Sequence, residues 1–307
     1  MIAHYDLFAG IGGFSIALEE VFTDEPIRHV FCEWEQFPTA VLKRHWPDGE
    51  FWGDIAELVT HTEREGRQRG VREATRQHRL RSRNGSNQSQ NWTIVTGGFP
   101  CQPFSVAGRR KGTADDRYQW PNMFAVIRHT KPEWVIAENV RGLVTWNDGM
   151  VLEQVCSDLE AEGYEVQPLI IPAVAVGAPH RRDRVWIIGH AKHDGCNGSQ
   201  DRQGNTTGDD SNTSRQNEAE QSKRPSVPRS SHAYPDWDQN WQEVAFATCD
   251  DSVDDGLPRL VDGIPYSRAK WRRDSLKAYG NGIVPQVAIE IMKAIKETTS
   301  EQTLSND

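Results

Sequence analysis

The chain lacks the features of a secreted, metal-binding or membrane protein. Its 307 residues contain five cysteines, scattered along the sequence: Cys32, Cys101, Cys156, Cys196 and Cys249. Their odd number and irregular spacing provide neither a disulfide framework nor a zinc-ligand pattern, which fits a reducing cytoplasm. The N-terminus has no signal-peptide pattern, and no apolar run approaches the roughly 18 residues that a membrane-spanning helix needs. We therefore expect a cytoplasmic protein with no bound metal and no membrane contact.

The chain also lacks the positive net charge typical of proteins that bind polyanions, since its formal net charge is −9 at pH 7. Binding depends on local patches, however, rather than on the average. Basic side chains gather in residues 64–83, 109–111 and 268–277, whereas acidic ones gather in residues 209–220 and 236–255. The composition therefore leaves a polyanionic partner open.

The most informative segment that is present is residues 97–105, with the sequence GGFPCQPFS. It follows the apolar run 92–95, which predicts a short buried strand. The glycine pair permits positive φ and lets a ligand approach the backbone closely. Pro100 and Pro103 each fix their own φ and push the preceding residue towards extended geometry. Most cysteines are buried and inert. Cys101, however, is predicted on a stiff loop at the carboxyl end of a strand, where open α/β sheets bind ligands.

A glycine-rich segment near the N-terminus, residues 6–14 (DLFAGIGGF), opens a predicted helix at residues 15–21. Such strand-to-helix turns let a nucleotide-like ligand lie against the backbone and the helix N-terminus. The next predicted strand, residues 28–32, ends at Glu33 and Trp34. A carboxylate there can accept hydrogen bonds from ribose hydroxyls, and an indole can stack on adenine. The pattern fits a nucleotide-like cofactor, a dinucleotide included.

Two further segments carry charged side chains next to apolar strands. Residues 134–140 (WVIAENV) read as a buried strand that ends in Glu138. Burial disfavours the charged carboxylate, so we expect a raised pKa for Glu138 unless it forms a structural salt bridge. Residues 177–184 (GAPHRRDR) precede the predicted strand 185–189. Their planar guanidinium groups suit bidentate contacts to oxygen acceptors.

The order of these motifs resembles that of the DNA (cytosine-5)-methyltransferases, over residues 6–189 and again over residues 260–295. The resemblance implies an α/β fold with a mostly parallel, doubly wound sheet (Rossmann-like, class I methyltransferase) and a small target-recognition region. It implies S-adenosylmethionine as the cofactor. The catalytic residues would be Cys101, Glu138, Arg182 and Arg184. The cofactor would be bound by Phe8, Gly10, Gly12, Gly13, Glu33, Trp34, Asp54, Ile55 and Asn281. His180 stands where the family usually has Gln, which leaves its role open.

The resemblance also implies the partners and the chemistry. The substrate would be cytosine in a specific double-stranded DNA sequence, flipped out of the helix and attacked by Cys101, with Glu138 at ring nitrogen 3. A monomer that associates with the nucleoid, with a cognate restriction endonuclease, is the further expectation. The alternatives are an RNA-directed cytosine-5 methyltransferase, a dinucleotide-dependent oxidoreductase and a nucleic-acid-binding module without catalysis.

Strand and helix patterns alternate up to residue 189, which predicts a mostly parallel sheet covered by helices. Further helices are expected at residues 37–45, 121–130, 150–162 and 287–296. The polar, Arg-rich residues 60–91 are expected to form an insertion that is helical over residues 64–79 and otherwise loose. A charge run of this kind is most often a solvated face.

The chain divides into two expected units. Residues 1–189 and 272–307 would form the catalytic, S-adenosylmethionine-binding domain. Residues 190–271 would form the small, partly disordered target-recognition region, because residues 201–231 are almost purely polar. Its small core would be built from Trp237, Trp241, Val244, Ala245 and Phe246.

Overall fold

The structure is a computed structural model of the chain. It describes all residues except 81–91, 101–117, 193–259, 262–263, 266 and 306–307. For residues 68–80, 260–261, 264–265, 268 and 300–305 it describes the backbone alone. Cys101 and the expected core around residues 237–246 therefore lie outside the described residues.

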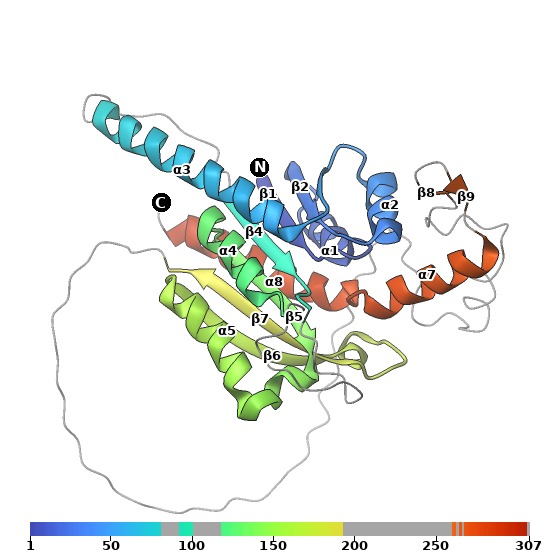
Figure 1. The fold of residues 1–307 in the computed structure, drawn as a ribbon. Coiled ribbons are helices and arrows are strands. Elements are labelled where there is room, and N and C mark those ends of the chain that lie inside the picture. Colours follow the sequence, from blue (N-terminus) through green and yellow to red (C-terminus); the bar gives the residue numbers. More distant parts are fainter. Residues whose placement is uncertain (81–91, 101–117, 193–259, 262–263, 266, 306–307) are drawn as a thin grey trace, which may run out of the picture.

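A seven-stranded sheet forms the centre of the molecule (Figure 1). Its strands are β1 (Ile2–Leu7), β2 (Ile27–Cys32), β3 (Glu50–Trp52), β4 (Trp92–Gly97), β5 (Trp134–Val140), β6 (Tyr164–Pro172) and β7 (Asp183–Ala191). They lie in the order β3-β2-β1-β4-β5-β7-β6. The pairs from β3 to β5 are parallel, whereas β7 runs antiparallel to both β5 and β6. This mixed, mostly parallel sheet confirms the predicted fold class.

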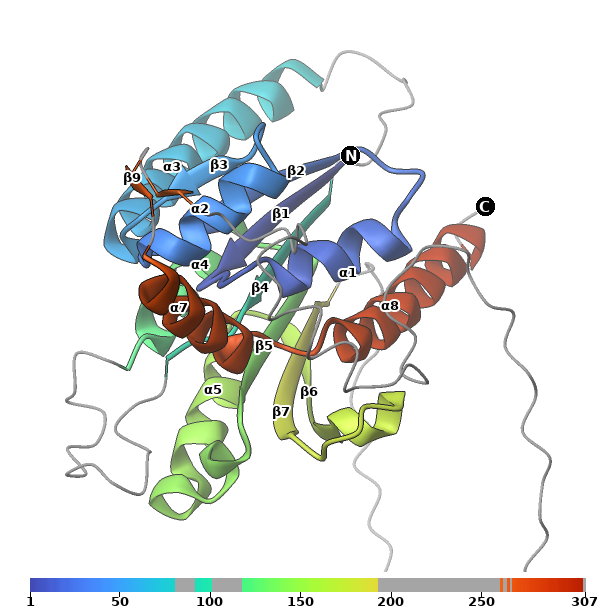
Figure 2. The same cartoon turned by 90° about the vertical axis from the view of Figure 1, so that its right-hand side faces the viewer.

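Helices cover both faces of the sheet (Figures 1 and 2). They are α1 (Gly13–Val21), α2 (Gln36–His45), α3 (Ile55–Leu80), α4 (Trp120–Thr130), α5 (Met150–Ala161), α7 (Arg268–Asn281) and α8 (Pro285–Ser305). A separate two-stranded sheet pairs β8 (Leu260–Val261) with β9 (Ile264–Pro265). Helices α1, α2, α4 and α5 begin and end within two residues of their predicted bounds.

The strand pattern explains why there are two helical layers. Successive side chains of a strand point to opposite faces. On β5, Val135 and Ala137 belong to the core cluster beneath α3, α4 and α5, whereas Trp134 and Ile136 belong to the cluster beneath α1 and α8. All four side chains are buried. A strand buried on both faces reads as a continuous apolar run, as residues 134–137 do.

Helix α3 contains the helix predicted over residues 64–79 but extends beyond it. It runs without a break from Ile55 to Leu80, so it begins before the expected insertion at residue 60. Its first turns cover the core, because Leu58 is fully buried and Thr62 contacts His129 of α4. A methyl group on Gly66 would lie 3.1 Å from the carbonyl oxygen of His129, so the two helices approach closely. The first part of the Arg-rich segment is therefore a structural helix.

The C-terminal helices also differ from the prediction. Helix α8 extends to Ser305, beyond the predicted end at residue 296, and α7 was not predicted as a helix. The Ser267 side chain caps α7 by accepting a hydrogen bond from the Lys270 amide. Helix α7 packs through Trp271 and Ala278 against α2. A pair of apolar residues seven positions apart is too weak a signal to identify a helix from sequence.

The described part of the chain contains neither a membrane-spanning helix nor a metal-binding group. None of the helices in it is both long enough and apolar enough to cross a membrane. Among these same residues, no three His, Cys, Asp or Glu side chains come together as a group that could hold a metal ion.

Candidate active site

The predicted site residues that the structure describes lie around one edge of the sheet. The carboxyl ends of β1 to β5 share this edge because these strands are parallel. Strand β7 runs the other way, so it begins there: Arg184 pairs with Val140, directly after Glu138 and Asn139. The glycine-rich turn, Glu33, Glu138 and the arginines therefore meet at the edge where open α/β sheets bind ligands.

The glycine-rich turn after β1 uses each glycine differently. Gly10 and Gly12 have φ values of +55° and +85°, which favour glycine. A methyl group on Gly12 would lie 2.5 Å from the ring of Trp46, and one on Gly13 would lie 2.6 Å from Cγ1 of Ile283. Nothing lies within 4 Å of the same position on Gly10. Gly12 and Gly13 thus permit close packing, whereas Gly10 leaves open space.

Glu33 holds this turn from the end of β2. Its carboxylate accepts hydrogen bonds of 2.8 Å from the backbone amides of Gly10 and Glu35. Burial raises the pKa of Glu33, and these backbone hydrogen bonds oppose the shift. A carboxylate oxygen can accept more than one hydrogen bond, so both oxygens retain acceptor capacity. The neighbouring Trp34 is 80% exposed, which leaves its ring open for stacking.

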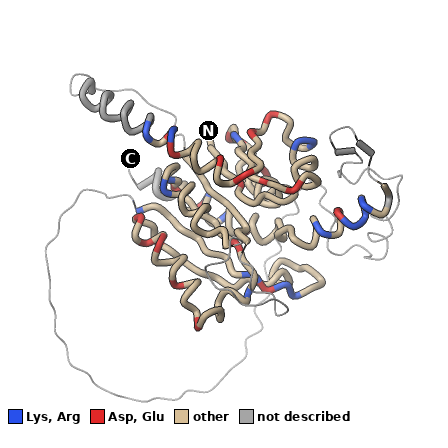
Figure 3. Tube along the Cα trace, in the orientation of Figure 1, with Lys and Arg blue, Asp and Glu red and all other residues tan. Residues whose placement is uncertain are grey.

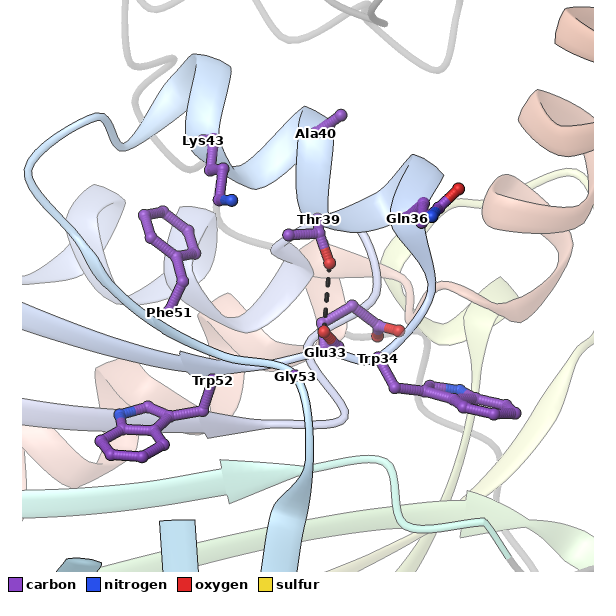
Figure 4. A pocket seen from close by; sticks show the side chains of 9 residues that line it. All are labelled: Glu33, Trp34, Gln36, Thr39, Ala40, Lys43, Phe51, Trp52 and Gly53. Atoms are coloured by element: carbon purple, nitrogen blue, oxygen red, sulfur yellow. Dashed lines mark hydrogen bonds between the residues drawn. The ribbon is translucent and has the colours of Figure 1, made fainter. Parts of the chain in front are cut away.

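A cavity of about 410 Å³ lies between α2 and the ends of β2 and β3 (Figure 4). Its lining residues are Glu33, Trp34, Gln36, Thr39, Ala40, Lys43, Phe51, Trp52 and Gly53. Thr39 donates to the Glu33 carbonyl oxygen across it. Of the predicted cofactor residues, only Glu33 and Trp34 line this cavity. The structure thus brings Glu33 and Trp34 together in this cavity.

The other predicted cofactor residues lie around the same edge in varied settings. Phe8 has a φ of +54°, in the left-handed region that disfavours a side chain. Asp54 Oδ1 accepts a 2.9 Å hydrogen bond from the Ala56 amide and so caps α3. Ile55 is buried in the core, and Asn281 is exposed at the end of α7.

Asp6 is a buried carboxyl that sequence reasoning left without a role. It accepts hydrogen bonds from Ser15 Oγ, at 2.8 Å, and from Thr96 Oγ1, at 3.2 Å. Complete burial raises the pKa of Asp6 to about 7, although these hydrogen bonds oppose the shift. Asp6 thereby joins the first turn of α1 to β4, the strand that precedes Cys101. Asp6 is the first residue of the glycine-rich motif, and this position is the one sequence feature that could have identified it.

Two buried histidines, His4 and His29, connect the Asp6–Thr96 hydrogen bond to Glu19 at the surface. His4 Nε2 lies 2.8 Å from Thr96 Oγ1, and His4 Nδ1 lies 3.0 Å from His29 Nδ1. His29 Nε2 in turn lies 3.1 Å from Glu19 Oε1. Burial, followed by the neighbouring His29, lowers the pKa of His4, so His4 is neutral at pH 7. A chain of hydrogen-bonded side chains therefore crosses β4, β1 and β2.

Glu138 and Arg184 form a close pair at the end of β5. Arg184 Nε lies 2.9 Å from Glu138 Oε1, and Glu138 is only 8% exposed. Burial raises the pKa of Glu138 to about 7, while the positive charges of Arg184 and Arg182 oppose the shift. The sequence left a raised pKa and a salt bridge as alternatives for this residue; the structure contains both. A carboxyl with a pKa near 7 can hold or release a proton at neutral pH.

The glycine pair before Cys101 makes room for this site. Neither Gly97 nor Gly98 takes the positive φ that the sequence permitted. A methyl group on Gly97 would lie 2.9 Å from the Leu7 carbonyl oxygen, and one on Gly98 would lie 3.3 Å from Glu138 Oε2. The absence of side chains therefore lets β4 approach β1 and lets the Glu138 carboxyl reach the loop.

Two hydrogen bonds hold the backbone of Phe99 and Pro100, the last described residues before Cys101. Asn139 Nδ2 donates a 3.0 Å hydrogen bond to the Phe99 carbonyl oxygen. The Gln119 amide donates a 3.2 Å hydrogen bond to the carbonyl oxygen of Pro100, the neighbour of Cys101. Sequence reasoning missed Asn139, although the motif that identified Glu138 contained it. The role of Cys101 stays a prediction.

Two other cysteines can be compared with Cys101. Cys32 and Cys156 are free thiols. Burial raises the pKa of both, in the case of Cys32 to about 12. Neither thiol is therefore ionised to a useful extent at neutral pH.

Arg182 contacts the connection between α7 and α8. Its Nη2 donates hydrogen bonds to the carbonyl oxygens of Gly280, at 2.9 Å, and Gly282, at 2.6 Å. Burial, followed by the charge of Arg184, lowers its pKa. Its Nε is buried and has no hydrogen-bond partner among the described residues. His180, two residues earlier, is exposed, and its role stays open.

Known proteins resemble this chain over most of these elements. Residues 2–244 of the 307 match the sequence profile of the family described as C-5 cytosine-specific DNA methylase. Type II methyltransferase M.HgiCII of Herpetosiphon aurantiacus is 32% identical over 185 residues, which are 60% of this chain and 36% of that protein. Type II methyltransferase M.HpaII of Haemophilus parainfluenzae is 31% identical over 196 residues, 62% of this chain and 47% of that protein.

The chain spans less than half the length of these two relatives, 36% and 47%. Among solved structures, the S. pombe Dnmt2 methyltransferase matches 64% of this chain and 52% of its own, with 20% identity and a TM-score of 0.45. The fold class rests on the strand order itself rather than on this similarity. The family profile, by contrast, matches well over half of the sequence. The chain belongs to the C-5 cytosine-specific DNA methylase family.

Proposed function

We propose that the chain transfers a methyl group from S-adenosylmethionine to carbon 5 of cytosine in a specific double-stranded DNA sequence. The observation that carries the proposal is the buried Glu138 carboxyl. It pairs with Arg184, has a pKa of about 7 and lies against Gly98 at the base of the Cys101 loop. Membership of the family supports the same reaction and argues against a dinucleotide-dependent oxidoreductase.

Glu138 is the proton source in this proposal. At neutral pH about half of the carboxyl groups carry a proton, because the pKa is about 7. The protonated carboxyl donates to ring nitrogen 3 of a cytosine flipped out of the duplex. This withdraws electrons from the ring and makes carbon 6 more electrophilic. Arg184 fixes the orientation of the carboxyl through its 2.9 Å contact.

Cys101 is the proposed nucleophile. A free thiol has a pKa of about 8.5, so only a few per cent is thiolate at neutral pH, but this fraction is strongly nucleophilic. The sulfur forms a bond to carbon 6, and the ring electron pair moves to carbon 5, which becomes nucleophilic. Loss of the carbon 5 proton and breakage of the sulfur–carbon bond later restore the ring. Asn139 and Gln119 hold the base of the loop on which Cys101 lies.

The residues around the glycine-rich turn fit S-adenosylmethionine, which supplies an electrophilic methyl group when bound. Glu33 retains acceptor capacity for ribose hydroxyls, and the exposed Trp34 ring offers a stacking surface for adenine. The open space at Gly10 allows a ligand to lie against the backbone. Phe8, Gly12, Gly13, Asp54, Ile55 and Asn281 complete the proposed site.

DNA binding would use the basic surfaces of the protein. Lys and Arg residues lie along α7 and near the start of β7 (Figure 3). Arg272 and Arg273 are exposed on α7. Because two relatives are named type II methyltransferases, a cognate restriction endonuclease is part of the proposal. The monomeric state and the location at the nucleoid stay predictions.

Bisulfite sequencing of DNA from cells that express the chain tests this function. We expect protected cytosines in one short sequence context with the wild type and none with Glu138→Gln, which cannot supply the proton. Protection of RNA cytosines, with DNA unprotected, would favour the RNA-directed alternative. No protected cytosine in either nucleic acid would contradict the proposal.

A further inference from the structure

Arg182 fixes a turn that is distant in sequence. Its Nη2 reaches the carbonyl oxygens of Gly280 and Gly282, which are 98 and 100 residues away along the chain. These two carbonyls lie on either side of Asn281. We call residues 280–282 the closing turn. The guanidinium therefore holds both ends of this turn, at the junction of α7 and α8.

The closing turn lies against the glycine-rich turn. Ile283, directly after it, occupies the space into which a side chain on Gly13 would extend, with Cγ1 at 2.6 Å from that position. A methyl group on Gly282 would lie 3.9 Å from Cγ1 of Ile11. A shift of the closing turn would therefore move these contacts and reshape the space around the glycine-rich turn.

The backbone of Arg182 is shaped for this contact. Its φ is +36°, in the left-handed region that a residue with a Cβ rarely adopts. Such a conformation persists only where surrounding contacts hold it. The neighbouring side chains are engaged elsewhere: Arg181 Nε lies 3.0 Å from Asp183, and Arg184 pairs with Glu138. Within this segment only Arg182 is directed to the closing turn.

We propose that Arg182 is a positioning residue for the cofactor side of the site. It holds the closing turn, with Asn281, against the glycine-rich turn, while Arg184 orients Glu138. The inference rests on the proposed function, in which the glycine-rich turn binds S-adenosylmethionine. It differs from the catalytic role that the family resemblance implies for Arg182.

Two substitutions separate these roles. Arg182→Met keeps a long apolar stem but removes every donor. Arg182→Lys restores one nitrogen with several hydrogens, which suffices because Nη2 alone makes both hydrogen bonds. Lysine cannot reproduce the planar, bidentate contact that recognition of a base by arginine would use. Arg181→Met is the matched control, since the Arg181 side chain is 75% exposed.

Hydrogen exchange in the cofactor-free protein directly tests whether Arg182 stabilises the closing turn. We expect the amides of residues 280–283 to exchange about tenfold faster in Arg182→Met than in Arg181→Met, since a lost charged hydrogen bond weakens local structure by about that factor. Arg182→Lys should restore most of the protection. Equal exchange in all three variants would overturn the proposal.

Calorimetry with S-adenosylmethionine and steady-state kinetics test whether loss of the Arg182 contacts weakens cofactor binding. Arg182→Met should raise the Kd and the KM for the cofactor about tenfold. Arg182→Lys should recover most of the affinity, and Arg181→Met should equal the wild type. A reduced kcat with unchanged cofactor affinity would overturn the proposal, as would an Arg182→Lys variant no better than Arg182→Met.

The two measurements distinguish a failure of the proposed function from a failure of the proposed role of Arg182. A wild-type chain that does not bind S-adenosylmethionine at all would contradict the function, while the exchange measurement would still report on the hold of Arg182. If Arg182→Met does not fold, Arg182→Gln decides, because its shorter, neutral amide cannot hold both carbonyl oxygens. Faster exchange and weaker cofactor binding in Arg182→Gln than in Arg181→Met support the proposal, and equality of the two variants overturns it.

Discussion

The buried Asp6 carboxyl predicts an unusual pH dependence of stability. Burial raises its pKa from 3.8 to about 7 in the folded protein. Between these two values the unfolded chain has lost the proton and the folded chain retains it. The free energy of unfolding therefore falls as pH rises from about 4 to about 7, and the Asp6 contribution is constant above pH 7.

The size of the effect follows from the shift. A shift from 3.8 to about 7 is about three pKa units, and each unit corresponds to 1.36 kcal/mol, so ionising Asp6 costs about 4 kcal/mol. Asp6→Asn removes the titrating group but keeps an acceptor for Ser15 or Thr96. Between pH 4.5 and pH 7.5, a window that covers most of this titration, the difference in stability between this variant and the wild type should therefore change by about 3 kcal/mol, in favour of the variant at high pH.

Urea unfolding at several pH values measures this difference. Asp24→Asn serves as the control, because Asp24 is an exposed aspartate in the loop after α1; its pH profile should run parallel to that of the wild type. Parallel profiles for Asp6→Asn and wild type would refute the reasoning. A difference that grows towards low pH would refute it as well, since that sign belongs to a carboxyl that is stabilised in its charged form.

Three further predictions concern the proposed reaction. Glu138→Gln should lower kcat at least about a hundredfold, the usual size of a general-acid contribution, in a tritium-transfer assay, and near-wild-type turnover would remove Glu138 from catalysis. Glu33→Ala should weaken S-adenosylmethionine binding by about 1–3 kcal/mol by calorimetry, through loss of a charge-assisted acceptor; unchanged affinity would exclude Glu33 from the site. Replacing Arg272 and Arg273 together by Ala should lower the log–log salt slope of DNA binding by about 1.8, since each phosphate contact contributes about 0.9. An unchanged slope would mean that this part of α7 does not touch DNA.

Local patterns were sufficient to predict most of the sheet and the edge at which the candidate site lies. The apolar run before Glu138 predicted a buried strand and, as one of two alternatives, the raised pKa that burial imposes on Glu138. The glycine-rich segment predicted a strand-to-helix turn, and α1 begins within it, at Gly13. These features depend on residues that are neighbours in sequence, so their chemistry is readable before the fold is known.

The features that could not be predicted depend on contacts between distant segments. Asp6 and Thr96 are 90 residues apart, and nothing local indicates that their strands lie side by side. Arg182 meets a turn about 100 residues away. Helix α7 carries few apolar side chains, and its packing on α2 through Trp271 exists only in the folded protein. Tertiary contacts override weak local signals in such cases.

Covalent trapping on a short DNA duplex that contains 5-fluorocytosine tests the central claim most directly. Fluorine cannot leave carbon 5 as a proton does, so the bond between enzyme and base persists after methyl transfer. We expect a stable protein–DNA adduct in the presence of S-adenosylmethionine, with the modified peptide carrying Cys101. Cys156→Ser should form the adduct as the wild type does, and Cys101→Ser should form none. An adduct that survives in Cys101→Ser, or that maps to another cysteine, would contradict the account.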